Sequence, residues 1–195
     1  MVGVVFGRRG SGKTFILKKR FQPNLKRPLF IVEPGCEYSS GIVFHSVSAL
    51  LNFIRKHPAT WQRKTYIMRI ETDESFEALL TLLKMTGGSL LVEEAWRYST
   101  ASQEHPLLSN ALVYGRHWGN ETGLDLILTS QRAARISRNA TSQADFILTF
   151  EQREPRDLAG MEEREPGVSE KIKALGKYEW LVIGEAPDWL ESEEK

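Results

Sequence analysis

A glycine-rich segment near the amino terminus carries the residues best suited to chemistry. Residues 7–14 read Gly-Arg-Arg-Gly-Ser-Gly-Lys-Thr, the G-x-x-x-x-G-K-[ST] spacing of a phosphate-binding P-loop. Glycines at this spacing let the backbone turn so that consecutive N–H groups point at an anion. The pattern predicts that Lys13 reaches nucleotide phosphates and that the Thr14 hydroxyl is a ligand of Mg²⁺. The residues expected to bind nucleotide are Gly7, Arg8, Arg9, Gly10, Ser11, Gly12, Lys13 and Thr14.

Two open questions attach to this loop. A chance glycine-rich turn gives the same letters, but here an apolar run precedes the motif and a helical stretch follows it, as a P-loop requires. The roles of Arg8 and Arg9 also stay open. They contact phosphate, contact a neighbouring subunit, or are solvated loop charges.

Two consecutive carboxylates form the second candidate group. Glu93 and Glu94 follow the apolar run Leu90-Leu91-Val92, which is the form of a Walker B segment. Parallel strands deliver their carboxyl ends to one edge of a sheet, so these acids should lie beside the P-loop. We assign Glu93 to Mg²⁺ and Glu94 to the attacking water, which it would orient or deprotonate. The alternative is a pair of charges at a solvated strand end.

The elements that would position these groups alternate along the chain. Apolar runs predict strands at 2–6, 28–33, 42–44, 65–70, 89–94, 124–130, 146–150 and 178–183. Helical spacing predicts helices at 13–21, 47–57, 75–85, 106–118, 154–164 and 169–175. This alternation is typical of an α/β fold in three layers, with a mainly parallel central sheet flanked by helices. The ligand site then belongs at the carboxyl edge of the strands.

Length and composition set wider limits. The 195 residues suit a single domain spanning 1–195, with a core at 2–150, a last strand within 151–184 and a tail at 185–195 whose acidic run 191–194 is expected to be solvated. A net charge of +1 neither indicates nor excludes nucleic-acid binding. The single cysteine excludes an intramolecular disulfide, and four scattered histidines lack metal-ligand spacing. We expect no cleavable leader and no transmembrane segment, hence a soluble intracellular protein.

A further set of residues resembles a known superfamily. An Arg-His-Trp-Gly segment at 116–119 precedes an apolar run that ends in Gln131 and Arg132, and residues 142–148 resemble a small polar helix leading into a strand. With the P-loop and the Glu93–Glu94 pair, this pattern resembles the FtsK–HerA superfamily of P-loop ATPases over residues 2–150. The resemblance implies a RecA/FtsK–HerA-like fold, with ATP and Mg²⁺ as cofactors.

The resemblance also implies catalytic roles. Gln131 matches a polar sensor that contacts the γ-phosphate or the attacking water, and Arg116 matches an arginine finger that acts across a subunit boundary. Arg132 and Arg135 compete for that finger role. One departure is that the first Walker B acid of the family is usually Asp. A longer Glu at position 93 leaves open which of Glu93 and Glu94 serves the metal and which the water.

Members of this superfamily are ring-forming motors that pump DNA, and compact members package viral genomes. The resemblance therefore implies an ATP-hydrolysing motor that translocates double-stranded DNA into a capsid, located in the host cytoplasm or with the virion. The implied partners are double-stranded DNA, further copies in a hexameric or pentameric ring, and capsid or membrane-vertex proteins. The candidate DNA contacts are Arg97, the loop 98–104, Arg135 and Arg138.

Two alternatives remain. The Glu-Glu-Ala-Trp run at 93–96 and the Arg-His pair at 116–117 also resemble zonula occludens toxin-like phage assembly ATPases, which usually carry a transmembrane segment. A P-loop small-molecule kinase is the second alternative, because a P-loop and this length suit both classes. The Gln-ended strand and the glutamate pair argue against a kinase.

Overall fold

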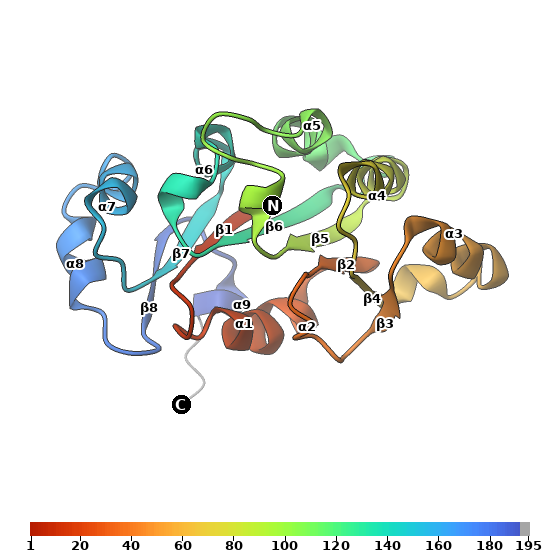
Figure 1. The fold of residues 1–195 in the computed structure, drawn as a ribbon, viewed down its shortest axis with the longest axis horizontal. Helices are drawn as coiled ribbons and strands as arrows, with labels where there is room; N and C mark the ends of the chain where they lie inside the picture. Colours follow the sequence, from red (N-terminus) through yellow and green to blue (C-terminus); the bar gives the residue numbers. More distant parts are fainter. Residues whose placement is uncertain (192–195) are drawn as a thin grey trace.

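An eight-stranded sheet organises the chain in the computed structural model, which describes residues 1–191 (Figure 1). Its strands run in the spatial order β3-β4-β2-β5-β6-β1-β7-β8. Paired strands are parallel except at one edge, where β8 runs antiparallel to β7. The strands are β1 (Val2–Phe6), β2 (Leu29–Val32), β3 (Ile42–Phe44), β4 (Thr65–Met68), β5 (Gly88–Val92), β6 (Leu124–Ser130), β7 (Phe146–Phe150) and β8 (Trp180–Gly184).

Helices cover both faces of this sheet, which makes three layers (Figure 1). One face carries α3 (Val47–Lys56), α4 (Asp73–Thr86), α5 (Pro106–Tyr114), α6 (Arg138–Gln143), α7 (Pro155–Glu162) and α8 (Val168–Ala174). The other carries α1 (Lys13–Ile16), a π-helical turn (Leu17–Phe21), α2 (Gln22–Asn24) and α9 (Asp188–Glu191). The predicted α/β architecture, three layers with a mainly parallel central sheet, is confirmed.

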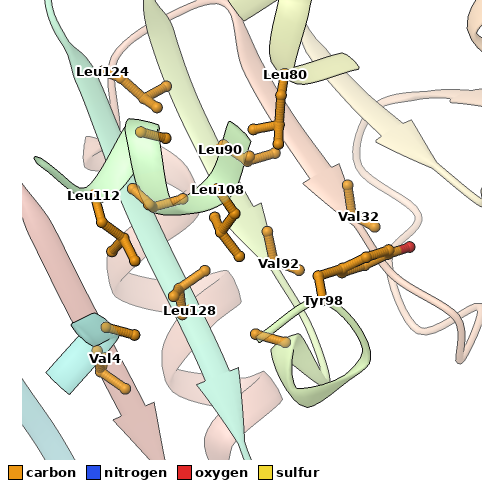
Figure 2. Close-up of a cluster of buried hydrophobic side chains, with 14 of the residues drawn as sticks. Val4, Val32, Leu80, Leu90, Val92, Tyr98, Leu108, Leu112, Leu124 and Leu128 are labelled. Atoms are coloured by element: carbon orange, nitrogen blue, oxygen red, sulfur yellow. The ribbon is translucent and has the colours of Figure 1, made fainter. Parts of the chain in front are cut away.

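Side chains of each strand alternate between the two layers, as the pleat requires. In β5, Leu90 and Val92 pack toward α4 and α5, whereas Leu91 packs toward the π-helical turn. Figure 2 shows the first of these clusters, in which Leu80 of α4 and Leu108 of α5 lie over the sheet. Burying each such side chain contributes roughly 1.5–3 kcal/mol. This packing fixes the sheet on which the candidate site is built.

The register of the central strands decides which residues meet at the carboxyl edge. Val92 pairs with Leu128 across β5 and β6. Phe6 pairs with Ser130 on one side and with Thr149 on the other. The segments that follow β5, β6, β1 and β7 therefore emerge side by side.

Several predicted boundaries were wrong at the ends of elements. The first helix continues beyond Phe21 to Asn24, because a π-helical turn carries the backbone onward. The helix predicted at 106–118 ends at Tyr114, since a 3₁₀ turn at Gly115–His117 redirects the chain toward β6. Helix α9 was not predicted, and of the acidic run only Glu191 lies within the described residues.

Four strands, β2, β4, β5 and β8, are shorter than predicted, and the differences in β5 and β8 change residues of the candidate site. Strand β5 ends at Val92, so Glu93 and Glu94 lie beyond it. Strand β8 begins at Trp180, which leaves Tyr178 in the preceding turn. Glu94 and Tyr178 both have positive φ, 52° and 70°, which lies outside the β region that side-chain-bearing strand residues adopt.

Within residues 1–191, no helix combines the length and the apolar character that crossing a membrane requires.

Candidate nucleotide-binding site

A cavity of about 770 Å³ opens at the carboxyl edge of the central strands. It brings together most of the residues that the sequence singled out, and its lining comes from five separate segments of the chain. Its lining consists of Arg8, Arg9, Gly10, Gly12, Lys13, Thr14, Phe15, Gly35, Glu37, Glu93, Glu94, Thr129, Gln131 and Tyr178. Of the predicted nucleotide-binding residues, only Gly7 and Ser11 are not part of this lining.

The P-loop has the backbone that its glycines allow. Gly10 and Gly12 have φ of 77° and 105°, which side-chain-bearing residues rarely adopt. A Cβ added to Gly7 would lie 2.5 Å from Ser11 Oγ. That Ser11 oxygen is buried and has no hydrogen-bond partner among the described residues. The loop therefore fits a phosphate group, which can accept a hydrogen bond from an otherwise unpartnered hydroxyl.

Lys13 lies at the centre of the loop. Its Nζ donates a hydrogen bond of 2.5 Å to the Gly7 carbonyl oxygen. Burial lowers the Lys13 pKa, while the nearby charges of Glu94, Glu93 and Glu37 raise it. An ammonium group partly removed from water and facing a cavity is placed to attract a phosphate.

Glu93 lies deeper than Glu94. Its side chain is almost buried, with the residue 9% exposed, and its Oε1 accepts a hydrogen bond of 3.0 Å from the Tyr38 hydroxyl. Burial raises the Glu93 pKa to about 7, and the charges of Glu37 and Glu33 add to that rise. The Tyr38 hydrogen bond and the charge of Lys13 act in the opposite direction. Glu93 and Thr14 line the same cavity, as they must if both are to hold one cation.

A loop after β2 supplies the partners of Glu93, and no motif in the sequence predicted them. Glu33, at the end of β2, is buried and forms an ion pair of 3.0 Å with Arg69 Nε. Its other oxygen accepts a 2.8 Å hydrogen bond from the Glu37 backbone N–H. This anchoring holds Glu37 and Tyr38 against the Walker B segment. No local motif marks the loop, because its partners lie 31 to 55 residues away along the chain.

Glu94 is held by two donors. Gln131 Nε2 donates to its Oε1 at 3.1 Å, and Trp96 Nε1 donates to its Oε2 at 2.7 Å. Glu94 also adopts the left-handed backbone region, which costs a non-glycine residue on the order of 1 kcal/mol. Strain of this kind gathers at functional sites. The predicted pair Glu94 and Gln131 is thus brought into direct contact.

Some of the arginines that the sequence singled out line the cavity, and others lie outside it. Arg8 lines the cavity and forms a 2.5 Å ion pair with Glu151, which follows β7. Arg116 lies outside the cavity, in the 3₁₀ turn Gly115–His117, which precedes β6 in the chain and contacts it. The Arg116 Nε donates a hydrogen bond to His117 Nε2. The structure therefore does not bring Arg116 to the cavity of its own chain.

The two arginines that compete for the finger role have other partners. Arg132 Nε forms a 3.0 Å ion pair with the buried carboxylate of Asp157. The guanidinium of Arg135 lies 5.8 Å from the centre of the Trp96 ring. Neither side chain lines the cavity.

Two exposed aromatic residues flank the P-loop and were missed by sequence reasoning. Phe15 is 66% exposed and Tyr178 is 60% exposed, although large apolar side chains are usually buried. Both also line an adjoining pocket of about 460 Å³ with Gly12, Ile16, Phe150 and Trp180. Flat, mostly apolar walls beside a phosphate loop suit a nucleobase. Phe15 had a signal, its place directly after the motif, but Tyr178 had none.

Among residues 1–191, no group of three or more His, Cys, Asp or Glu side chains is arranged to hold a metal ion. A P-loop Mg²⁺ does not need one. It relies on the loop hydroxyl, one acidic residue, water and the phosphates of the substrate. Thr14 and Glu93 are the residues that would hold it.

Comparison with known proteins now identifies the class. The sequence matches no protein-family model and no curated protein. The fold is similar to that of the genome packaging NTPase B204 from Sulfolobus turreted icosahedral virus 2 in complex with AMPPCP, with a TM-score of 0.75 and 27% identity. That match covers 93% of this chain and 90% of the other. The chain is a P-loop ATPase.

Two further known structures are similar to this P-loop ATPase. B204 of Sulfolobus turreted icosahedral virus, described as a DNA-packaging ATPase, matches with a TM-score of 0.72 and 26% identity, covering 93% of this chain and 90% of that one. VirB4 of Thermoanaerobacter pseudethanolicus matches with a TM-score of 0.53 and 12% identity, covering 98% of this chain and 91% of that one. The likeness to VirB4 extends to the fold alone. The resemblance to viral genome-packaging ATPases inferred from the motifs is confirmed by the two B204 structures.

Proposed function

We propose that this P-loop ATPase is a motor subunit that uses ATP hydrolysis to move double-stranded DNA, and that it packages a viral genome into a capsid. One observation carries the proposal. The cavity joins a P-loop, two acidic residues and a glutamine sensor in a chain that is similar along nearly all its length to a genome-packaging NTPase. The proposed location is the host cytoplasm or the virion.

In this scheme the P-loop binds the triphosphate. Backbone N–H groups and the Lys13 ammonium contact the β- and γ-phosphates, and Thr14 and Glu93 hold Mg²⁺. When bound, the cation neutralises charge that develops on the phosphate oxygens. Phe15 and Tyr178 take the base.

Glu94 and Gln131 act on the water. Glu94 orients it and accepts its proton as the water oxygen attacks the γ-phosphorus, and the bond from that phosphorus to the ADP oxygen breaks. Gln131 contacts the γ-phosphate or the water through its amide. The 3.1 Å hydrogen bond between the two side chains keeps them at one reaction centre.

A ring of five or six copies would complete the site. Because Arg116 lies away from the cavity of its own chain, it would reach a phosphate only in a neighbouring subunit. An arginine there stabilises charge on the transferring phosphoryl group. Arg97, the exposed loop residues 101–103, Arg135 and Arg138 would face the DNA, and capsid or membrane-vertex proteins would anchor the ring. Tyr98 and Ser99 of the predicted loop 98–104 are buried and do not take part.

The test is steady-state ATP hydrolysis with and without double-stranded DNA at two salt concentrations, with Glu94→Gln as the inactive control. We expect DNA to stimulate hydrolysis, and we expect the stimulation to fade at high salt because phosphate contacts are screened. A rate of ATP hydrolysis that is the same with and without DNA would support an assembly or secretion ATPase instead. Phosphate transfer to a small acceptor, with no hydrolysis in its absence, would support a kinase.

A further inference from the structure

Trp96 has an unusual place beside the catalytic residues. It lies two residues after Glu94, in the 3₁₀ turn η3 (Ala95–Arg97), and its side chain is 36% exposed. It does not line the nucleotide cavity. Its indole N–H nevertheless donates the 2.7 Å hydrogen bond to Glu94 Oε2. Trp96 thus touches the catalytic carboxylate from outside the cavity.

The Trp96 ring also lies near an arginine side chain. Arg135 lies 5.8 Å from the ring centre, and it comes from the turn that follows β6. Arg97 is the next residue in the chain. Exposed aromatic rings beside arginines are a common means of contacting nucleic acid, since the arginine binds phosphate and stacks on the ring.

The turn that carries Trp96 is braced on its far side. Tyr98 stacks on Phe76 with ring centres 3.7 Å apart, and the Ser99 hydroxyl donates to Glu104 at 3.0 Å. The Ser137 hydroxyl also donates to that glutamate, which ties the loop to the start of α6. Because these contacts fix the backbone of the turn, a change at the Trp96 ring would act mainly through its hydrogen bond to Glu94.

We propose that Trp96 is a positioning residue that couples the DNA-facing surface to the catalytic base. Its N–H sets the orientation of the Glu94 carboxylate, and DNA bound across Trp96 and Arg135 adjusts that orientation. The inference rests on the proposed function, because it assigns the regulation of the same site. Trp96 acts through Glu94 and makes no contact with substrate.

Trp96→Phe tests the inference, because it keeps an aromatic ring for Arg135 and removes only the N–H donor. We expect kcat to fall about tenfold with the KM for ATP unchanged, since one hydrogen bond to a charged group is lost. We also expect stimulation by double-stranded DNA to disappear. Trp96→Ala should lower kcat no further but weaken DNA binding, which separates the N–H from the ring.

A spectroscopic readout keeps this test separate from that of the proposed function. The indole ¹H–¹⁵N signal of Trp96, identified by its loss in Trp96→Phe, should shift in Glu94→Gln and on addition of double-stranded DNA. Wild-type kcat and DNA stimulation in Trp96→Phe would overturn the inference while leaving the ATPase proposal intact. A wild-type protein without ATPase activity would refute the proposed function. In that case an indole signal that moves with neither change would overturn the inference as well.

Discussion

Gln131 Nε2 donates a 3.1 Å hydrogen bond to Glu94 Oε1, across the ends of the neighbouring strands β6 and β5. The two residues are 37 positions apart in the sequence. The parallel register, which pairs Leu128 with Val92, brings them together. The proposed water activator and the proposed phosphate sensor are thereby joined at the edge of the sheet.

The first prediction concerns this unit. Glu94→Gln should lower kcat by about 10²–10⁴-fold, because the general base is removed while its shape is kept. Nucleotide affinity should change little, since Lys13 and the P-loop remain. Gln131→Ala should also lower kcat, and the double variant should lose less than the product of the two single losses. Single-turnover hydrolysis with separate nucleotide titrations measures both effects, and a fully multiplicative double variant would show that the two residues act independently.

The second prediction concerns the buried Glu93. Its pKa is about 7 in the folded protein, against an ordinary value of 4.5, and burial is the main cause. Between these two pH values the unfolded carboxyl is ionised while the folded one keeps its proton. The free energy of unfolding should therefore fall by on the order of 2–3 kcal/mol as pH rises from about 4.5 to about 7, and then level off.

Thermal unfolding of Glu93→Gln, without Mg²⁺, checks this sign. The variant lacks the titrating group, so its stability should vary less than that of wild type across this range. Tyr38→Phe is the matched control, because it removes the hydrogen bond that lowers the Glu93 pKa. In this variant the fall in the free energy of unfolding should extend to higher pH. Identical pH dependence in wild type and Glu93→Gln would contradict the account.

The third prediction concerns the aromatic residues beside the P-loop. Tyr178→Ala and Phe15→Ala should each weaken ATP binding about tenfold, because base–aromatic stacking is lost. GTP should bind about as well as ATP, since the pocket side chains are mostly apolar. Calorimetric titration measures these affinities, with Met85→Ala as a control at an exposed apolar side chain on α4. Unchanged ATP affinity in Tyr178→Ala and Phe15→Ala, or an equal loss in Met85→Ala, would refute the assignment.

The fourth prediction separates an arginine with a buried ion-pair partner from one whose ion pair is exposed. Arg132→Ala should lower the free energy of unfolding by about 2–3 kcal/mol, because it leaves the buried carboxylate of Asp157 without its ion pair. Arg138→Ala should cost less than about 0.5 kcal/mol, since its ion pair with Glu163 is exposed. Chemical denaturation measures both. Equal stabilities would mean that Arg132 is free for another role.

The fifth prediction concerns the arginine finger. Arg116→Ala should leave the folded chain stable and abolish ATP turnover in the assembled protein. Mixing it with Glu94→Gln should restore part of the activity, because a mixed ring contains interfaces with an intact Glu94 on one side and an intact Arg116 on the other. Recovery in the mixture indicates action between subunits. No recovery at any mixing ratio would exclude Arg116 as the finger.

Much of the fold could be predicted because its signals are local. Each of the eight strands is a short apolar run, and the P-loop motif fixes its own strand and helix. Boundaries failed where tertiary contacts decide them. Glu94, for example, belongs by composition to a strand, but it leaves the sheet in a left-handed conformation to meet Gln131 and Trp96.

The site divides in the same way. Lys13, Thr14, Glu93, Glu94 and Gln131 carry motif spacing and were predicted to converge, as they do. Tyr38 and Tyr178 carry none. Tyr38 contacts Glu93 from a loop whose partners are distant in the sequence, and Tyr178 lines the cavity from a turn with positive φ. Arg116 shows a third limit, because its proposed partner lies in another copy of the chain.

The most direct test of the central claim is movement along DNA itself. A triplex-forming strand is bound to one end of a DNA duplex, and its displacement by the assembled protein is followed after ATP is added. A motor should displace the strand with ATP, and Glu94→Gln should bind ATP without displacing it. Rapid, DNA-stimulated hydrolysis with no displacement in either orientation of the duplex would contradict translocation and favour an assembly ATPase.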